Sequence, residues 1–332
     1  GCHMIEIRQD PTTRTWILVG HSGAEFGRKH APDGCPFCPG HEAETPPTLA
    51  AIAGPDGAWQ VRAFPDKMPV FQVEGDLGRE AEGMYDRMRN VGAHEVVVET
   101  REHGTTLARL PAEDIARVLQ MFRRRIQDLK NDIRFRYIQV FKNQGLQAGS
   151  LISHAHSHLV ATPVIPRRLE AELRWSKRHF DLKERCMYCD ILRQEMSQGT
   201  RVVEQHPAFV AFCPFAPRFP YEVWILPVAH RHRFEDLDDP ALAGLAQIVK
   251  RVLQRVEGMV PDYHMVLHTS PNEKSPAIWG LAWESLMDDF HWHIEILPRP
   301  TEVTRLHREE EFYVNSVPPE DAARQLRDVP LA

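Results

Sequence analysis

Hydrophobic positions along this chain repeat a strand, helix, strand, strand order twice. The first copy comprises a strand at 94–99, a helix from about residue 111, a strand at 136–141 and a strand that contains His154. The second copy comprises a strand at 221–226, a helix that includes 242–256, a strand at 263–268 and a strand at 290–296. Before the first copy, short strands are predicted at 5–8, 15–19 and 61–67. Two copies of one unit predict a pseudo-twofold molecule with halves at 4–165 and 166–332.

The two predicted helices are amphipathic. Their apolar residues lie three or four positions apart, which places them on one face of a helix. The stripe of the first helix consists of Ile115, Val118, Leu119, Phe122, Ile126 and Leu129, and that of the second consists of Leu242, Leu245, Ile248, Val249, Val252, Leu253 and Val256. Both stripes are predicted to lie in the core.

Three histidines, His154, His156 and His158, stand at alternate positions of one predicted strand. Because side chains alternate sides along a strand, the three imidazoles are predicted on one face, about 7 Å apart. An imidazole titrates near neutral pH, can bind a metal through one nitrogen, and can act as a nucleophile when a partner holds the other nitrogen. A polar edge strand is the alternative. The glycine-containing loop before the strand and the cysteine pairs elsewhere favour a reactive or metal-binding site.

The cysteines form one Cys-x-x-Cys pair in each half. Cys2, which precedes Met4, is interpreted as part of a cloning remnant. In a reducing compartment such pairs favour metal binding over disulfides. Each half also has a histidine in the turn between strand and helix and another in its last strand, which completes a Cys₂His₂ set suited to structural zinc. The predicted Zn²⁺ ligands are Cys35, Cys38, His103 and His154 in the first half and Cys186, Cys189, His230 and His291 in the second. The alternative is two fortuitous turns with buried thiols.

The charge and hydropathy of the chain restrict its partners. With 40 Lys and Arg against 46 Asp and Glu, the net charge is −6, so no basic field for nucleic acid is expected. No apolar run reaches the roughly 18 residues of a membrane span, and the N-terminus lacks the pattern of a signal peptide. We therefore predict a cytoplasmic protein without nucleic-acid or membrane partners.

If His154 is a zinc ligand, His156 is free to react. A neutral imidazole that attacks phosphorus forms a phosphoramidate, which divides one phosphoryl-type transfer into two displacements. The attack needs an acceptor on the other ring nitrogen and donors for the developing negative charge. The predicted donors are Asn143, Gln144, His158 and the main-chain amides from Gly145 to Ser150. Glycine at 145 would let the backbone approach a phosphate closely.

Several motifs together resemble the galactose-1-phosphate uridylyltransferase family. They are RQDPTTRTWILV at 8–19, CPFCPG at 35–40, FKNQG at 141–145 and SHAHSH at 153–158, and the resemblance runs from Ile5 to a tail near 312–320. This family is the transferase branch of the histidine-triad superfamily, which also contains ADP-glucose phosphorylase. Membership implies an α+β fold of two fused histidine-triad-like halves, with antiparallel sheets and flanking helices. It also implies a ping-pong reaction through a nucleotidyl-histidine and a homodimer whose tail helps to build the neighbouring site.

The resemblance implies roles for individual residues. His156 matches the nucleophile, His154 matches the zinc ligand before it, and Asn143 matches a residue that contacts the nucleotidyl phosphate. Asp66 and Lys67 are the candidates at the nucleotide pocket, where the family usually has Asn in place of Asp66. These residues are predicted to bind the nucleotide part of the substrate.

The chain also departs from the family pattern. His158 replaces the usual Gln of the transferases and resembles the hydrolase branch, and Leu151 replaces a phosphate-contacting Ser. Three glutamates at 309–311 replace a glycine-rich segment that approaches the sugar phosphate. In the second half, His293 is the counterpart of His156 and Glu295 stands in place of the third histidine, which predicts a half without catalysis.

These features predict a nucleotidyltransferase of carbohydrate metabolism. The first interpretation is an enzyme that exchanges groups between a UDP-sugar and a sugar 1-phosphate, as in galactose metabolism. Its substrates would be a nucleoside diphosphate sugar and a phosphate-bearing acceptor. The alternatives are an ADP-glucose or dinucleotide phosphorylase, a nucleotidyl hydrolase that uses His158, and a zinc-stabilised module that binds a nucleotide without catalysis. The sequence does not select the base or the sugar.

Overall fold

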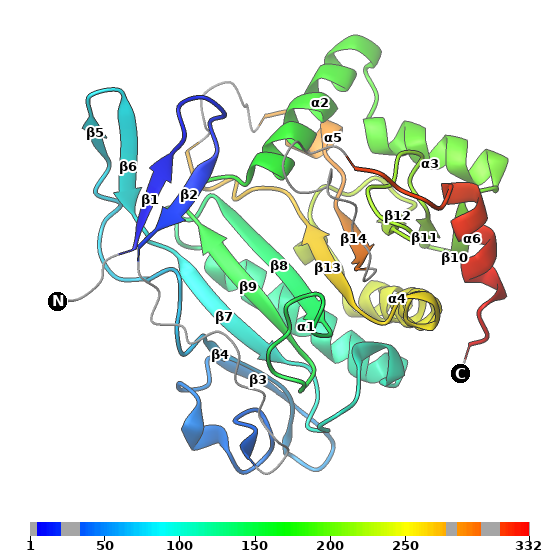
Figure 1. Ribbon diagram of the computed structural model, residues 1–332, viewed down its shortest axis with the longest axis horizontal. Coiled ribbons are helices and arrows are strands. Elements are labelled where there is room, and N and C mark those ends of the chain that lie inside the picture. Colours follow the sequence, from blue (N-terminus) through cyan, green and yellow to red (C-terminus); the bar gives the residue numbers. More distant parts are fainter. Residues whose placement is uncertain (1–4, 21–33, 277–283, 300–312, 332) are drawn as a thin grey trace.

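The computed structural model describes residues 5–20, 34–276, 284–299 and 313–331. Ten strands in these residues form one antiparallel sheet across the molecule (Figure 1). In order across the sheet they are β10 (Val202–His206), β11 (Phe209–Phe212), β12 (Val223–Pro227), β14 (His293–Pro298), β13 (Tyr263–His268), β8 (Tyr137–Gln144), β9 (His156–Thr162), β7 (Ala93–Val98), β4 (Trp59–Pro65) and β3 (Ala50–Ala53). Each strand predicted for the two copies is present, although β9 begins at His156 and excludes His154.

The strand order is the same on both sides of the centre of the sheet. The strands β8 and β13 pair in the middle, with Phe141 opposite Val266. Outward from this pair come β9 and β14, then β7 and β12, then β4 and β11, and finally β3 and β10. This order confirms the predicted pseudo-twofold arrangement. The two halves share a single sheet, because main-chain hydrogen bonds between β8 and β13 join them.

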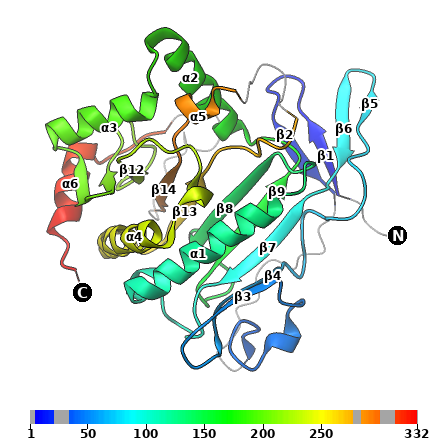
Figure 2. The ribbon, with the colours of Figure 1, turned by 180° about the vertical axis from the view of Figure 1, so that it is seen from behind.

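The helices α1 (Ala112–Leu129) and α4 (Asp239–Met259) cover one face of this sheet and pack against each other (Figure 2). Both predicted apolar stripes are buried in the core beneath them. Asp238 caps α4, because its side chain accepts a hydrogen bond from the main-chain nitrogen of Ala241. Among the described residues, no helix is long and apolar enough to cross a membrane.

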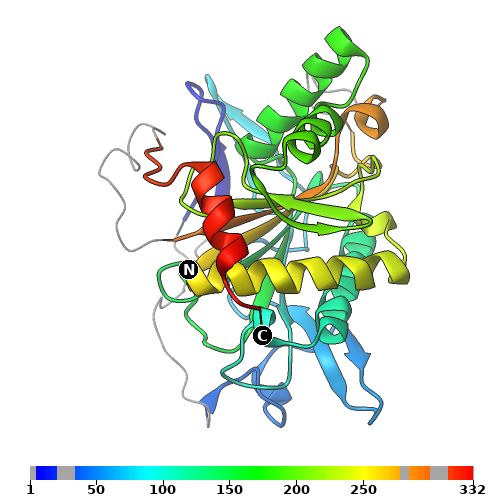
Figure 3. The same cartoon turned by 90° about the vertical axis from the view of Figure 1, so that its right-hand side faces the viewer.

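Four other α-helices of the described residues were not predicted. They are α2 (Arg167–Lys183), α3 (Met187–Gln198), α5 (Leu286–Asp289) and α6 (Pro319–Asp328). Figure 3 shows α6 lying across α4, where it also contacts β10. Short 3₁₀ turns are η2 (Glu42–Glu44), η3 (Leu107–Arg109) and η4 (Phe234–Asp236).

A separate four-stranded sheet contains the two strands predicted nearest the N-terminus. Its order is β2 (Trp16–Val19), β1 (Glu6–Gln9), β6 (Tyr85–Arg89) and β5 (Glu80–Glu82). Cys2, which was interpreted as part of a cloning remnant, lies outside the described residues, and so do the three glutamates at 309–311.

A buried ion pair lies beneath the strand that carries His156. Lys142 donates to the carboxylate of Glu99 at 2.8 Å and to the main-chain carbonyl of His156 at 3.2 Å. The hydroxyl of Ser157 also donates to Glu99. Both charged side chains are almost completely buried. The pair therefore connects β8 and β9 to the residue that follows β7.

Lys142→Met is expected to lower the free energy of unfolding by about 3–5 kcal/mol, because it leaves the carboxylate of Glu99 buried without its cation. Urea denaturation measures the change. The double variant Lys142→Met/Glu99→Gln removes both charges and is expected to recover part of the loss. An unchanged unfolding free energy in the single variant would contradict the structural role of this pair.

Candidate active site and metal centres

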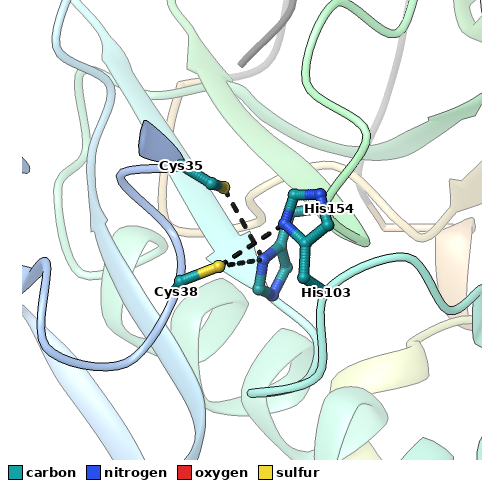
Figure 4. A group of neighbouring side chains, drawn as sticks. All are labelled: Cys35, Cys38, His103 and His154. Atoms are coloured by element: carbon teal, nitrogen blue, oxygen red, sulfur yellow. Dashed lines mark hydrogen bonds between the residues drawn. The ribbon is translucent and has the colours of Figure 1, made fainter. Parts of the chain in front are cut away.

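The first predicted metal set converges in the structure (Figure 4). The Sγ atom of Cys38 lies 3.4 Å from Nδ1 of His103 and 3.6 Å from Nδ1 of His154, and Sγ of Cys35 lies 3.7 Å from Nδ1 of His154. A tetrahedral ion with bonds of about 2.0–2.3 Å holds its nitrogen and sulfur ligands roughly 3.3–3.8 Å apart. The other nitrogen of His154 donates to the main-chain carbonyl of Thr100 at 2.8 Å, which fixes the ring. These four residues could therefore hold one metal ion.

The second predicted set repeats this arrangement in the other half. The Sγ atom of Cys189 lies 3.4 Å from Nδ1 of His230 and 3.7 Å from Nδ1 of His291, and Sγ of Cys186 lies 4.0 Å from Nδ1 of His291. His291 donates its other N–H to the main-chain carbonyl of Pro227 at 3.0 Å. Two thiols and two imidazoles match the donor set that zinc prefers. The two sites are thus equivalent under the pseudo-twofold axis.

His156 begins β9 and has the geometry of a nucleophile. Its Nδ1–H donates to the main-chain carbonyl of His154 at 2.7 Å, which leaves the lone pair of Nε2 available. Burial lowers the pKa of His156 to about 4, so the imidazole is neutral at pH 7. The ring of Phe37 lies edge-on to it, with centroids 5.3 Å apart.

The prediction that His154 lies in the same strand as His156 and His158 was wrong. This residue precedes β9, and its ring turns toward the cysteines of the first metal set. His156 and His158 do project from the same face of the strand, with ring centroids 5.1 Å apart. His154 therefore lies just outside the strand, and its main-chain carbonyl orients His156.

A cavity of about 300 Å³ opens beside His156. It is lined by residues 142–146 and 150–156. Four of the predicted substrate-binding residues therefore line it, namely Asn143, Gln144, Gly145 and Ser150, and so does Leu151. Lys67 is exposed and makes no side-chain hydrogen bond to any of the described residues.

Residues of the second half support the wall of this cavity. Nδ1–H of His264, on β13, donates to the Oδ1 atom of Asn143 at 2.7 Å, which leaves the NH₂ group of Asn143 free to donate. The Oδ2 atom of Asp262 accepts from the main-chain nitrogen of Gln147 at 2.7 Å. Gly145 has a φ of +82°, and a Cβ atom there would lie 2.2 Å from Asp262. The sequence interpretation missed His264 and Asp262.

Asp66, His94 and His158 form a third group next to His156. Nε2 of His94 lies 3.2 Å from Nδ1 of His158 and 3.5 Å from Oδ2 of Asp66, and Nδ1 of His158 lies 4.0 Å from the same carboxylate oxygen. The ring of Phe141 stacks on His158 at 5.1 Å. The sequence interpretation considered Asp66 and His158 separately and missed His94. Alternation along the predicted strand at 94–99 would have placed His94 on the face of Val96.

The counterpart of His156 in the second half is closed to substrate. His293 is completely buried, with Trp224 stacked on it at 5.6 Å and Tyr188 at 5.0 Å. Glu295, which stands in the place of His158, pairs with the guanidinium groups of Arg168 and Arg218. An imidazole without solvent contact cannot meet a substrate in this conformation.

The chain is similar in sequence to known proteins over nearly its whole length. The chain is 30% identical to the ADP-glucose phosphorylase of Arabidopsis thaliana, over 98% of this chain and 93% of that protein. It is 26% identical to the galactose-1-phosphate uridylyltransferase of Thermotoga maritima, over 98% of each chain.

Solved structures superimpose over nearly the whole chain. The crystal structure of an ADP-glucose phosphorylase from Arabidopsis thaliana with bound ADP-glucose has a TM-score of 0.79 and 29% identity, and covers 99% of each chain. A uridylyltransferase structure has a TM-score of 0.80 and 27% identity, and covers 98% of each chain. The models of the N-terminal and C-terminal domains of galactose-1-phosphate uridyl transferase match residues 27–166 and 172–299. The chain therefore belongs to the galactose-1-phosphate uridyl transferase family.

Proposed function

We propose that this enzyme transfers a nucleotidyl group from a nucleoside diphosphate sugar to a phosphate-bearing acceptor through a covalent intermediate on His156. The observation that carries the proposal is the orientation of His156. The carbonyl of His154 holds its Nδ1–H at 2.7 Å, and the imidazole lines a cavity beside Asn143. A neutral imidazole fixed in this way is suited to attack phosphorus.

The reaction has two displacements at one phosphorus atom. Nε2 of His156 attacks the α-phosphorus of the donor, an N–P bond forms, and the bond from this phosphorus to the bridging oxygen breaks, so the sugar 1-phosphate leaves. A phosphate oxygen of the acceptor then attacks the same phosphorus, and the N–P bond breaks. The NH₂ group of Asn143 and the main-chain amides of the cavity wall would stabilise the charge that develops on the phosphoryl oxygens.

Zinc in the two Cys₂His₂ sets would have a structural role. Each set has four protein ligands, which leaves no coordination position for a substrate. The first set fixes His154, and the carbonyl of His154 in turn orients His156. This ion would therefore hold the nucleophile in position without contact to the reacting atoms.

Two donors are candidates. A UDP-hexose is supported by the similarity to the Thermotoga galactose-1-phosphate uridylyltransferase, whereas ADP-glucose is supported by the similarity to the Arabidopsis ADP-glucose phosphorylase. With a hexose 1-phosphate as the acceptor the product is a new nucleoside diphosphate sugar. With inorganic phosphate the product is a nucleoside diphosphate.

The test is the intact mass of the zinc-loaded protein after brief incubation with UDP-glucose, ADP-glucose or diadenosine tetraphosphate, without acceptor. A gain of one UMP or one AMP would support the covalent mechanism and identify the base. Addition of phosphate or of hexose 1-phosphate should then discharge the adduct and identify the acceptor. Steady release of free nucleotide without an acceptor would indicate a hydrolase. No adduct and no turnover with any donor would overturn the proposal in favour of a binding module.

His264→Phe is expected to lower kcat by about 10- to 100-fold, because Asn143 loses the hydrogen bond that positions its amide. His264→Gln retains an N–H donor and is expected to recover most of the rate. Steady-state kinetics measure both variants, and melting temperatures control for folding. Equal rates for the two variants would contradict a positioning role for this hydrogen bond.

A further inference from the structure

Two of the departures from the family pattern meet in space. Asp66 and His158 are 92 positions apart in the sequence. In the structure, one side-chain nitrogen or oxygen atom of each of Asp66, His94 and His158 lies within 4.0 Å of those of the other two. Their three ligand atoms are separated by 3.2, 3.5 and 4.0 Å. An ion with bonds of about 2.0–2.2 Å to nitrogen and oxygen places neighbouring ligand atoms roughly 3.0–3.6 Å apart. The group is therefore close to the geometry of a metal site.

The chemistry of the three side chains also suits a metal. Two imidazoles and one carboxylate are ligands for divalent ions of the first transition series. Burial lowers the pKa of both His94 and His158, which disfavours the protonated rings. The side chains are 13–21% exposed, unlike a fully enclosed site. Three protein ligands leave at least one coordination position for water or a phosphate oxygen, in contrast to the Cys₂His₂ sets.

The cavity beside His156 lacks a free positive charge in the part of the chain that the structure describes. Lys142 is the cationic residue among those that line it, and its ammonium group is paired with Glu99. A diphosphate substrate carries negative charge on both phosphate groups. A divalent ion next to His156 would balance this charge and stabilise the charge that moves to the leaving phosphate.

We propose that Asp66, His94 and His158 form a third metal site, open on one side, that binds a divalent ion such as Mn²⁺ or Zn²⁺ and presents it to a phosphate group of the substrate. The role toward phosphate rests on the proposed function, whereas binding of the ion does not. In this site His158 is a metal ligand, where the transferases usually have Gln, a neutral hydrogen-bond donor. Asp66 supplies a negative charge, where the family usually has Asn.

The test is a titration of the zinc-loaded protein with Mn²⁺ alone, followed by the electron paramagnetic resonance signal of free Mn²⁺. Wild type is expected to bind about one Mn²⁺ per chain. Asp66→Asn and His158→Gln are expected to weaken binding at least about tenfold. Glu273→Gln is the matched control, because Glu273 forms a carboxylate–histidine pair with His232 at 3.4 Å and lies outside the proposed site. This variant is expected to bind Mn²⁺ as wild type does.

Absence of Mn²⁺ binding in wild type, or equal binding by wild type, Asp66→Asn and His158→Gln, would overturn the site and leave the group as a hydrogen-bonded network. A parallel measurement of adduct formation, with and without Mn²⁺, tests the role toward phosphate. An adduct rate that does not respond to Mn²⁺ would overturn that role alone. A protein that binds Mn²⁺ at these residues but forms no adduct with any donor would overturn the proposed function and keep the metal site.

Discussion

His156→Gln is expected to abolish the covalent adduct and to lower kcat by about 10⁴-fold or more, the order found when a covalent nucleophile is removed. Glutamine fills a similar volume and keeps hydrogen-bonding atoms, but it has no nucleophilic nitrogen. The cavity, Asn143 and the metal sets remain in place, so substrate binding should change little. Intact mass after donor incubation, combined with steady-state kinetics, measures the effect.

The controls for this variant separate chemistry from folding. His156 is outside both Cys₂His₂ sets, so zinc content and melting temperature should stay close to those of wild type. His206→Gln is a matched substitution on β10, an edge strand six positions from β9 in the sheet, and should keep both the adduct and the rate. A nucleotide label that persists in His156→Gln would assign the nucleophile to another residue.

Cys38→Ser is expected to remove one metal ion per chain, to lower the free energy of unfolding by several kcal/mol and to stop adduct formation. Structural zinc contributes about 10–16 kcal/mol of apparent binding free energy in small zinc domains, and much of this is folding free energy. Without the ion, the ring of His154 keeps only its hydrogen bond to Thr100, and its carbonyl is expected to lose the position in which it holds Nδ1 of His156. Metal analysis, chemical denaturation and the adduct assay measure the three effects.

The second metal set provides the comparison. Cys189→Ser should also lose one ion and stability, but it should retain the adduct, because the residue that His291 orients is the buried His293. Cys213→Ser replaces a buried thiol outside both sets and should keep both ions. Equal loss of the adduct in Cys38→Ser and Cys189→Ser would indicate a general folding defect in place of the proposed link to His156.

Local patterns in the sequence were sufficient for several features. The apolar stripes of α1 and α4 were predicted because a helix places residues three and four apart on one face, whatever the rest of the fold. The repeated spacing of cysteines and histidines predicted both metal sets, because two cysteines and two histidines in each half form the donor set of a structural zinc site. The duplication itself predicted the pseudo-twofold arrangement. Each of these features can be read from a single segment of the sequence or from the comparison of two segments.

Tertiary structure alone decided which distant residues meet. His264 reaches Asn143 because β13 pairs with β8 in a register that places these two residues opposite each other. His94 meets His158 because β7 pairs with β9. Cross-strand neighbours depend on a register that the hydrogen bonds of the whole sheet select, and no local pattern contains it. The sequence therefore determined which side chains are available as candidate ligands and nucleophile, whereas the pairing of the strands decided which residues surround His156.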